Sequence, residues 1–100
     1  MSLPIPVPHS QFLEELPNWS IQHKRPAIVR DFTFPDFPSC MSFLMHVAFL
    51  AEQHDHHPEF TQCYNRLSIL LTTHDINGLS NKDLTMAHAI NHVYSSKEIK

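Results

Sequence analysis

Apolar and polar residues alternate with different periods along the chain, and these periods predict its secondary structure. Between residues 38 and 54, apolar side chains recur every three or four positions, which is typical of a helix with a buried face. Asp36 is placed to cap this helix, and Pro38 is tolerated because it falls in the first turn. Pro58 disfavours a helical conformation at the residue before it, so we expect the helix to stop at the two preceding histidines.

The apolar face of this helix is wide because two stripes run along it. The first stripe consists of Phe37, Met41, Leu44, Ala48 and Ala51. The second stripe consists of Cys40, Phe43, Val47 and Leu50. One sheet surface needs less apolar area than both stripes provide. We therefore expect the second stripe to be buried by another subunit, the alternative being that the N-terminal segment folds back over it.

Strict alternation over residues 63–73 predicts a strand. On this strand Leu67, Ile69 and Leu71 point one way and form a core face against the helices. The opposite set of side chains is mostly polar and ends at His74. We therefore expect His74 to project away from the main core, which makes a role in packing less natural for it.

A hairpin is predicted nearer the N-terminus. Residues 27–34 are rich in β-branched and aromatic side chains, and residues 18–22 read as a short strand before them. The short turn at residues 24–26 favours antiparallel pairing of the two. Arg30 interrupts the apolar face of the longer strand, so that face should not be buried along its whole length.

The remaining segments are predicted from turn and capping residues. Residues 1–9 carry Pro-x-Pro-x-Pro spacing and should form a loosely ordered extended arm. Residues 10–16 can form one or two helical turns, with Ser10 as the cap and Pro17 ending them. Residues 75–78 form a turn in which Gly78 is free to take a positive φ.

The last helix is expected over residues 81–96, capped by Ser80. Ser80 and Asp83 have the spacing of a capping box. The whole chain, residues 1–100, then reads as one α+β domain: a single antiparallel sheet of about four strands with two main helices packed on one face. Residues 60–64 or the arm would supply the fourth strand.

Composition excludes several classes of function. The 100 residues are 42% apolar, which is ordinary for a globular domain. Seven Lys and Arg are scattered and the net charge is −3, so the chain lacks the clustered positive charge that direct nucleic-acid binding needs. Two cysteines make no disulfide framework, the first eight residues lack the features of a signal peptide, and no apolar run is long enough to span a membrane. We expect a cytoplasmic protein.

Histidine is the outlier in composition, with nine residues. Three of them, with three carboxylates, fall within residues 52–59. A histidine pair at the end of a helix is by itself most often a surface feature favoured by the helix dipole. Zinc is a rival interpretation, because the chain offers several donors: His54, His56, His57, Cys63 and His74. These donors lack a standard ligand spacing, and adjacent histidines have difficulty serving one ion, so we expect no metal.

Together, seven spaced residues resemble the signature of the pterin-4a-carbinolamine dehydratases: Glu52, His56, His57, Pro58, Tyr64, His74 and Asp83. The strings His-His-Pro-Glu-Phe, Thr-His-Asp and Gly-Leu-Ser-x-x-Asp occur in the order of that family, and the looser similarity runs from about residue 16 to 93. Phe60 is a departure, because the family commonly has tryptophan there. Phenylalanine keeps an aromatic surface but loses the indole N–H.

The resemblance implies a hydro-lyase that dehydrates 4a-hydroxytetrahydropterin to quinonoid dihydropterin and recycles the tetrahydrobiopterin cofactor of aromatic amino-acid hydroxylases. The reaction needs one acid near the departing hydroxyl and one base near N5, and imidazole can serve as either at neutral pH. No redox change occurs, so no metal or organic cofactor is expected. The resemblance implies that His56, His57 and His74 are the catalytic set, with the assignment of acid and base left open.

The same resemblance assigns supporting roles in substrate binding to seven further residues: Glu52, Pro58, Phe60, Thr73, Asp75, Ile76 and Asp83. For Asp83 the structural alternative is the capping box alone. The expected partners are the pterin substrate, further copies of the chain in a homodimer or homotetramer, and a functionally coupled hydroxylase. The non-enzymatic alternative is a dimerisation or coactivator module, a role that some animal members of the family have.

Overall fold

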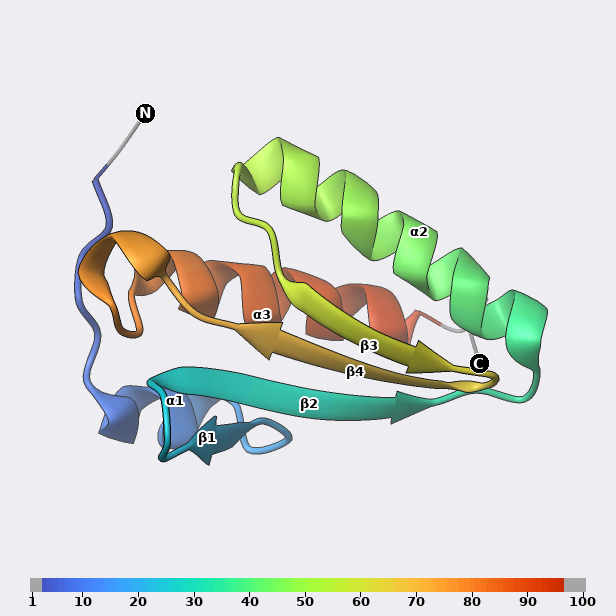
Figure 1. The fold of residues 1–100 in the computed structure, drawn as a ribbon, viewed down its shortest axis with the longest axis horizontal. Coiled ribbons are helices and arrows are strands. Elements are labelled where there is room, and N and C mark those ends of the chain that lie inside the picture. Colours follow the sequence, from blue (N-terminus) through green and yellow to red (C-terminus); the bar gives the residue numbers. More distant parts are fainter. Residues whose placement is uncertain (1–2, 97–100) are drawn as a thin grey trace.

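A computed structural model describes residues 3–96, and within them four strands form one antiparallel sheet of the order β1-β2-β4-β3 (Figure 1). The strands are β1 (Ser20–Gln22), β2 (Ala27–Thr33), β3 (Glu59–Cys63) and β4 (Arg66–Leu71). The helices are α1 (His9–Glu15), α2 (Phe37–His54), α3 (Asn81–Ser95) and the short 3-10 turn η1 (His74–Ile76). The predicted α+β class is confirmed.

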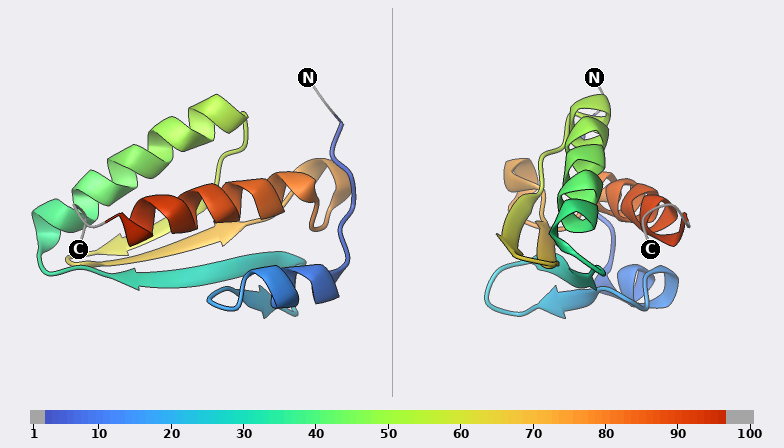
Figure 2. Two further views of the ribbon diagram at one scale, coloured as in Figure 1. Left: turned by 180° about the vertical axis from the view of Figure 1, so that it is seen from behind. Right: turned by 90° about the vertical axis from the view of Figure 1, so that its right-hand side faces the viewer.

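The two long helices lie on the same face of the sheet, as predicted (Figure 2). The core forms between them and the inward side chains of the central strands: Ile28 and Phe32 from β2, and Leu67, Ile69 and Leu71 from β4. Leu67, Ile69 and Leu71 therefore face the helices, as the alternation along this strand predicted. Burial of this apolar set is the main favourable term that holds the helices on the sheet.

Arg30 does interrupt the buried face of β2. Its guanidinium lies over the rings of Phe32 and Tyr94, 4.7 and 5.0 Å from their centroids, and donates to Asn91 Oδ1 at 2.6 Å. Burial lowers the pKa of Arg30. The aromatic faces and the amide oxygen replace part of the water that the cation loses at the end of the core.

The prediction that another subunit buries the second stripe of α2 is wrong. Cys40, Phe43 and Val47 are fully buried in the core of the chain itself, so no second subunit is needed to cover them. The reason is the rotation of α2, which turns this stripe toward the aromatic side chains of β2 and toward α3; Phe43 packs on Phe32 with ring centroids 5.1 Å apart. A different set of large apolar side chains is exposed, here named the outer face of α2: Phe37, Met41, Met45 and Phe49.

Residues 63–73 are not one strand, because a tight turn at residues 64 and 65 separates β3 from β4, and β4 ends at Leu71. Cys63 pairs with Arg66, and the two residues between them join β3 to β4 as a hairpin. Tyr64 takes a positive φ of 50°, and the side chain of Asn65 donates to the carbonyl of Phe34 at 2.9 Å. Two-residue hairpin loops favour such left-handed conformations. The fourth strand is β3, which overlaps the predicted segment 60–64.

The turn after β4 differs from its prediction in one residue. Asn77 takes the positive φ, at 51°, whereas Gly78 does not. Asparagine tolerates this conformation better than most residues. Thr73 and Gly78 then pair in an isolated β-bridge, with Thr73 N donating to Gly78 O at 2.9 Å. This bridge closes the loop and brings the start of α3 beside the end of β4.

Where a loosely ordered arm was expected, residues 5–7 are hydrogen bonded to the start of α3. Ile5 N donates to Asn81 Oδ1 at 2.8 Å, Asn81 N donates to Ile5 O at 2.9 Å, and Val7 N donates to Leu79 O at 3.2 Å. The helix that follows begins at His9 and has Pro8, not Ser10, at its N-cap position. Within residues 3–96, no helix is long and apolar enough to cross a membrane.

Candidate active site

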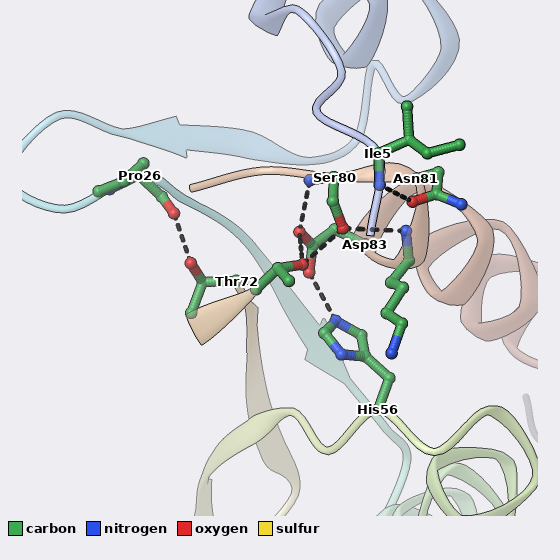
Figure 3. A network of polar contacts seen from close by, with 9 residues as sticks. Ile5, Pro26, His56, Thr72, Ser80, Asn81 and Asp83 are labelled. Atoms are coloured by element: carbon green, nitrogen blue, oxygen red, sulfur yellow. Dashed lines mark hydrogen bonds and ion pairs between the residues drawn. The ribbon is translucent and has the colours of Figure 1, made fainter. Parts of the chain in front are cut away.

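The histidine pair lies where α2 ends. Asp55 adopts a left-handed conformation with φ 51° and ψ 45°, and the N–H of His56 donates to the carbonyl of Ala51 at 3.1 Å. A left-handed residue of this kind is a common way to end a helix. The helix therefore ends at His54, slightly before the histidine pair at which it was expected to stop, and the chain then projects His56 toward the start of α3 (Figure 3).

One cleft brings the three predicted catalytic histidines together. Its volume is about 250 Å³. The residues that line it come from the end of α2, the end of β4, η1 and the first turn of α3: Asp55, His56, His57, Thr72, Thr73, His74, Asp75 and Lys82. His74 starts η1 directly after β4, and its side chain lies on the same cleft as His56. His56 is buried, whereas His57 and His74 are exposed.

Asp83 lies beneath His56 and is completely buried. Its Oδ1 lies 2.6 Å from His56 Nε2. Its Oδ2 accepts hydrogen bonds from Thr73 Oγ1 at 2.7 Å and from the backbone N–H of Ser80 at 2.9 Å. The Ser80 and Thr73 hydroxyl oxygens are 2.6 Å apart, which closes the network (Figure 3). The predicted capping box is present, and the same carboxylate also holds a histidine.

This network determines how the ring of His56 can be used. A carboxylate accepts hydrogen bonds and does not donate them, so His56 Nε2 is the protonated nitrogen in the neutral ring. Nδ1 is then the ring nitrogen left for a substrate. The bond to Asp83 therefore fixes both the orientation and the tautomer of the His56 ring.

Glu52 and His57 form a second carboxylate–imidazole pair of a different kind. Glu52 Oε2 lies 2.7 Å from His57 Nε2, but the side chains are 76% and 60% exposed. Exposed ion pairs of this sort are weak because water and salt screen them. Glu52 therefore orients His57 less firmly than Asp83 orients His56.

Several residues assigned to substrate binding do not line this cleft. Phe60 lies on β3 opposite Ile69 and is 38% exposed, and neither Pro58 nor Ile76 is part of the cleft wall. Thr73 and Asp75 do line it. A contact between a pterin and Phe60, Pro58 or Ile76 stays a prediction.

Sequence reasoning missed three residues of the cleft wall: Asp55, Thr72 and Lys82. Thr72 could have been found, because the alternation of β4 places it on the same side as His74. Its Oγ1 donates to the carbonyl of Pro26 at 2.6 Å, which ties the end of β4 to the β1–β2 turn (Figure 3). Lys82 lies between the two capping-box residues, and no sequence pattern marks this position as part of a site.

The rival metal site has no geometric support in the residues described. No group of three or more His, Cys, Asp or Glu side chains within residues 3–96 is arranged to hold a metal ion. Cys40 is buried in the core, and this burial raises the pKa of its thiol. Cys63, at the end of β3, is exposed and does not line the cleft.

Comparison with known proteins gives one consistent family. Residues 8–93 match the family described as "Pterin 4 alpha carbinolamine dehydratase". A relative from Rhizorhabdus wittichii, named as a candidate pterin-4-alpha-carbinolamine dehydratase, is 54% identical over 78 residues, which cover 78% of this chain and 80% of the relative. A relative from Chloroflexus aggregans with the same name is 44% identical over 84 residues, covering 84% and 88%.

A solved structure from Brucella melitensis, described as a transcriptional coactivator/pterin dehydratase, superimposes with a TM-score of 0.81. Its sequence is 38% identical, and the match covers 85% of this chain and 90% of that one.

Proposed function

Because the chain belongs to the pterin 4 alpha carbinolamine dehydratase family, we propose that it removes water from 4a-hydroxytetrahydropterins by histidine acid–base catalysis. The product is the quinonoid dihydropterin. The observation that carries this proposal is the single cleft on which His56, His57 and His74 meet. They come from two elements far apart in the sequence, the end of α2 and the segment after β4.

The chemistry requires two proton transfers and no change of oxidation state. The bond between C4a and its hydroxyl oxygen breaks, the oxygen leaves as water with one added proton, and N5 gives up a proton as the C4a–N5 double bond forms. In this proposal, His56 Nδ1 accepts the N5 proton, because Asp83 stabilises the resulting imidazolium. His57 or His74 supplies the proton to the departing hydroxyl, and both are exposed to the water that reprotonates them.

The proposed biological role is the return of the pterin cofactor to an aromatic amino-acid hydroxylase. Hydroxylation leaves the pterin as the 4a-carbinolamine, and dehydration is the step that precedes its reduction. This role follows from the reaction and from the family, and it makes the hydroxylase a functional partner without requiring direct contact.

The test is the rate of quinonoid formation, followed by stopped-flow absorbance with a freshly generated 4a-carbinolamine. His56→Ala and His74→Ala should each lower turnover by at least about a hundredfold, the usual effect of removing a general acid or base. His57→Ala should be impaired mainly in KM. His46→Ala is the matched control, because His46 is exposed on α2 and lies outside the cleft. If all variants lose only affinity, the chain is a pterin-binding protein and the dehydratase proposal is wrong.

We also propose that the chain forms a homodimer or homotetramer through the outer face of α2. Phe37, Met41, Met45 and Phe49 are spaced by four residues and are 45%, 36%, 57% and 64% exposed. Exposed apolar side chains gathered along one helix mark an interaction surface more often than chance exposure does. Side chains spaced by four residues form a ridge along a helix, and two such ridges can pack against each other. A second copy of α2 is therefore the simplest partner. The same face would serve a non-enzymatic binding module.

A further inference from the structure

A second hollow adjoins the catalytic cleft. It has a volume of about 170 Å³ and is lined by His54, His56, Asn81, Lys82 and Thr85. His56 and Lys82 line both this hollow and the cleft. The two spaces therefore meet at one shared rim, and a molecule whose ring lies in the cleft can extend a substituent past His56 into the hollow.

The two spaces differ in charge. Two carboxylates, those of Asp55 and Asp75, belong to the wall of the cleft. The lining of the hollow contains no carboxylate, and its ionised group is the ammonium of Lys82. Lys82 lines both spaces, so its charge is opposed by two carboxylates in the cleft and by none in the hollow, and an anionic substituent is favoured in the hollow.

The hollow also offers neutral donors. The backbone N–H of Ile5 donates to Asn81 Oδ1 at 2.8 Å, which fixes the amide so that its NH₂ group is the part left for a ligand (Figure 3). Thr85 adds a hydroxyl, and His54 adds an imidazole at the end of α2. Together with the ammonium, these groups are the donor set that a phosphate or carboxylate requires.

Lys82 has no evident role in the fold. It lies in the first turn of α3, where the helix dipole favours acidic side chains and opposes basic ones. The ion pairs formed within residues 3–96 do not include it, although it is half-buried. A local cost without a compensating contact inside the chain is expected at functional sites. The ligand then supplies the anionic group that pairs with the ammonium of Lys82.

We infer that the hollow binds an anionic group, a phosphate or a carboxylate, at the far end of the substituent on C6 of the pterin, with Lys82 as its main contact. This inference rests on the proposed function, because it takes the pterin ring to occupy the cleft. It names the substrate class as pterins with an acidic tail. Lys82 is then a specificity residue that does not take part in the proton transfers.

The experiment compares three stable oxidised pterins by quenching of their fluorescence: one with a neutral trihydroxypropyl tail, its terminal phosphate ester, and the analogue with a terminal carboxylate. At low salt, at least one anionic pterin should bind the wild type about tenfold or more tightly than the neutral one, as expected for a charge-assisted hydrogen bond. The larger ratio identifies phosphate or carboxylate as the preferred group. The preference should decrease as ionic strength rises.

Three variants test the role of Lys82. Lys82→Gln should reduce the preference for an anionic tail to about one, and Lys82→Arg should keep it. Lys24→Gln is the control, because it removes the same charge from a residue that lines neither the cleft nor the hollow. Equal binding of all three pterins by the wild type, or a preference that persists in Lys82→Gln, would overturn the inference.

Turnover of a 4a-carbinolamine with only a 6-methyl group separates this inference from the proposed function. If the wild type dehydrates it and no preference for an anionic tail is found, the tail site is wrong and the dehydratase stands. If the 6-methyl compound is not dehydrated and no pterin binds, both are wrong.

Discussion

Replacing Asp83 with asparagine changes one oxygen into an amide nitrogen and tests how His56 is prepared for catalysis. Oδ2 of Asp83 accepts from Ser80 N and Thr73 Oγ1, and both are donors. In Asp83→Asn, the amide oxygen must therefore stay on that side, and the NH₂ group must face His56. His56 Nε2 then becomes an acceptor, the ring proton moves to Nδ1, and the base that faces the substrate is lost.

The expected magnitudes follow from the three hydrogen bonds. A bond to a charged group contributes about 1.5–3 kcal/mol and a neutral one about 0.5–1.5 kcal/mol, so the free energy of unfolding should fall by roughly 1–3 kcal/mol. A domain of ordinary stability, with about 5–15 kcal/mol, stays folded after this loss. Turnover should fall by about 10²–10⁴-fold, because general base catalysis is removed.

Two measurements check this reasoning. Stopped-flow assays should show the loss in kcat with little change in KM, and thermal unfolding should show a folded variant. ¹⁵N chemical shifts of the imidazoles should report the Nε2–H form of His56 in the wild type and the Nδ1–H form in Asp83→Asn. Asp31→Asn is the control, since Asp31 is exposed on β2. Near-normal turnover, or an unchanged tautomer with lost activity, would refute the role assigned to Asp83.

Three further outcomes are expected. Glu52→Gln should change the free energy of unfolding by less than about 0.5 kcal/mol and lower turnover less than Asp83→Asn does, because its pair with His57 is exposed. Phe49→Glu should reduce the assembly size in sedimentation velocity. The N–H of Ser39 lowers the pKa of Asp36, so the stabilising cap is present above about pH 4 and is lost as pH falls through the lowered pKa. Asp36→Ala should therefore lower Tm at pH 7, with a smaller difference in acid.

Much of the fold could be predicted because local rules and tertiary packing agree along most of the chain. Asp36 caps α2, Ser80 caps α3, and the alternation of Leu67, Ile69 and Leu71 gives the buried face of β4. Each of these signals depends on a few neighbouring residues. The class of the fold followed from their order.

The predictions from sequence are wrong where the pattern of apolar residues does not determine the rotation of a helix about its axis or the position of a turn. The period of α2 shows that a wide face is apolar, but not which part of it faces the sheet; that depends on how Phe43 fits between Phe32 and Phe34. Likewise, the alternation of Leu67, Ile69 and Leu71 does not show where the strand begins, so Tyr64 and Asn65 did not reveal the break between β3 and β4.

The sequence pointed to the three histidines of the candidate site but not to the contacts that hold them. The spacing of His56, His57 and His74 pointed to one constellation, and the structure brings them to one cleft. The bond between His56 and Asp83 joins residues 27 positions apart, and no local pattern predicts such a contact. Lys82 contributes to the cleft only because the loop before α3 folds back on Thr73.

The side chain of Asp83 serves both the capping box and His56, and it uses a different carboxylate oxygen for each. Oδ2 completes the helix start and Oδ1 holds His56. Glutamate is the usual acidic residue at this capping position, so Asp83→Glu should preserve the start of α3. The added methylene displaces the carboxylate in a fully buried site, and His56 Nε2 loses its 2.6 Å contact. Asp83→Glu should therefore keep most of the helical circular dichroism while turnover falls at least tenfold. Equal turnover in the glutamate variant would mean that any nearby carboxylate suffices, and that the orientation of His56 is not what the chemistry needs.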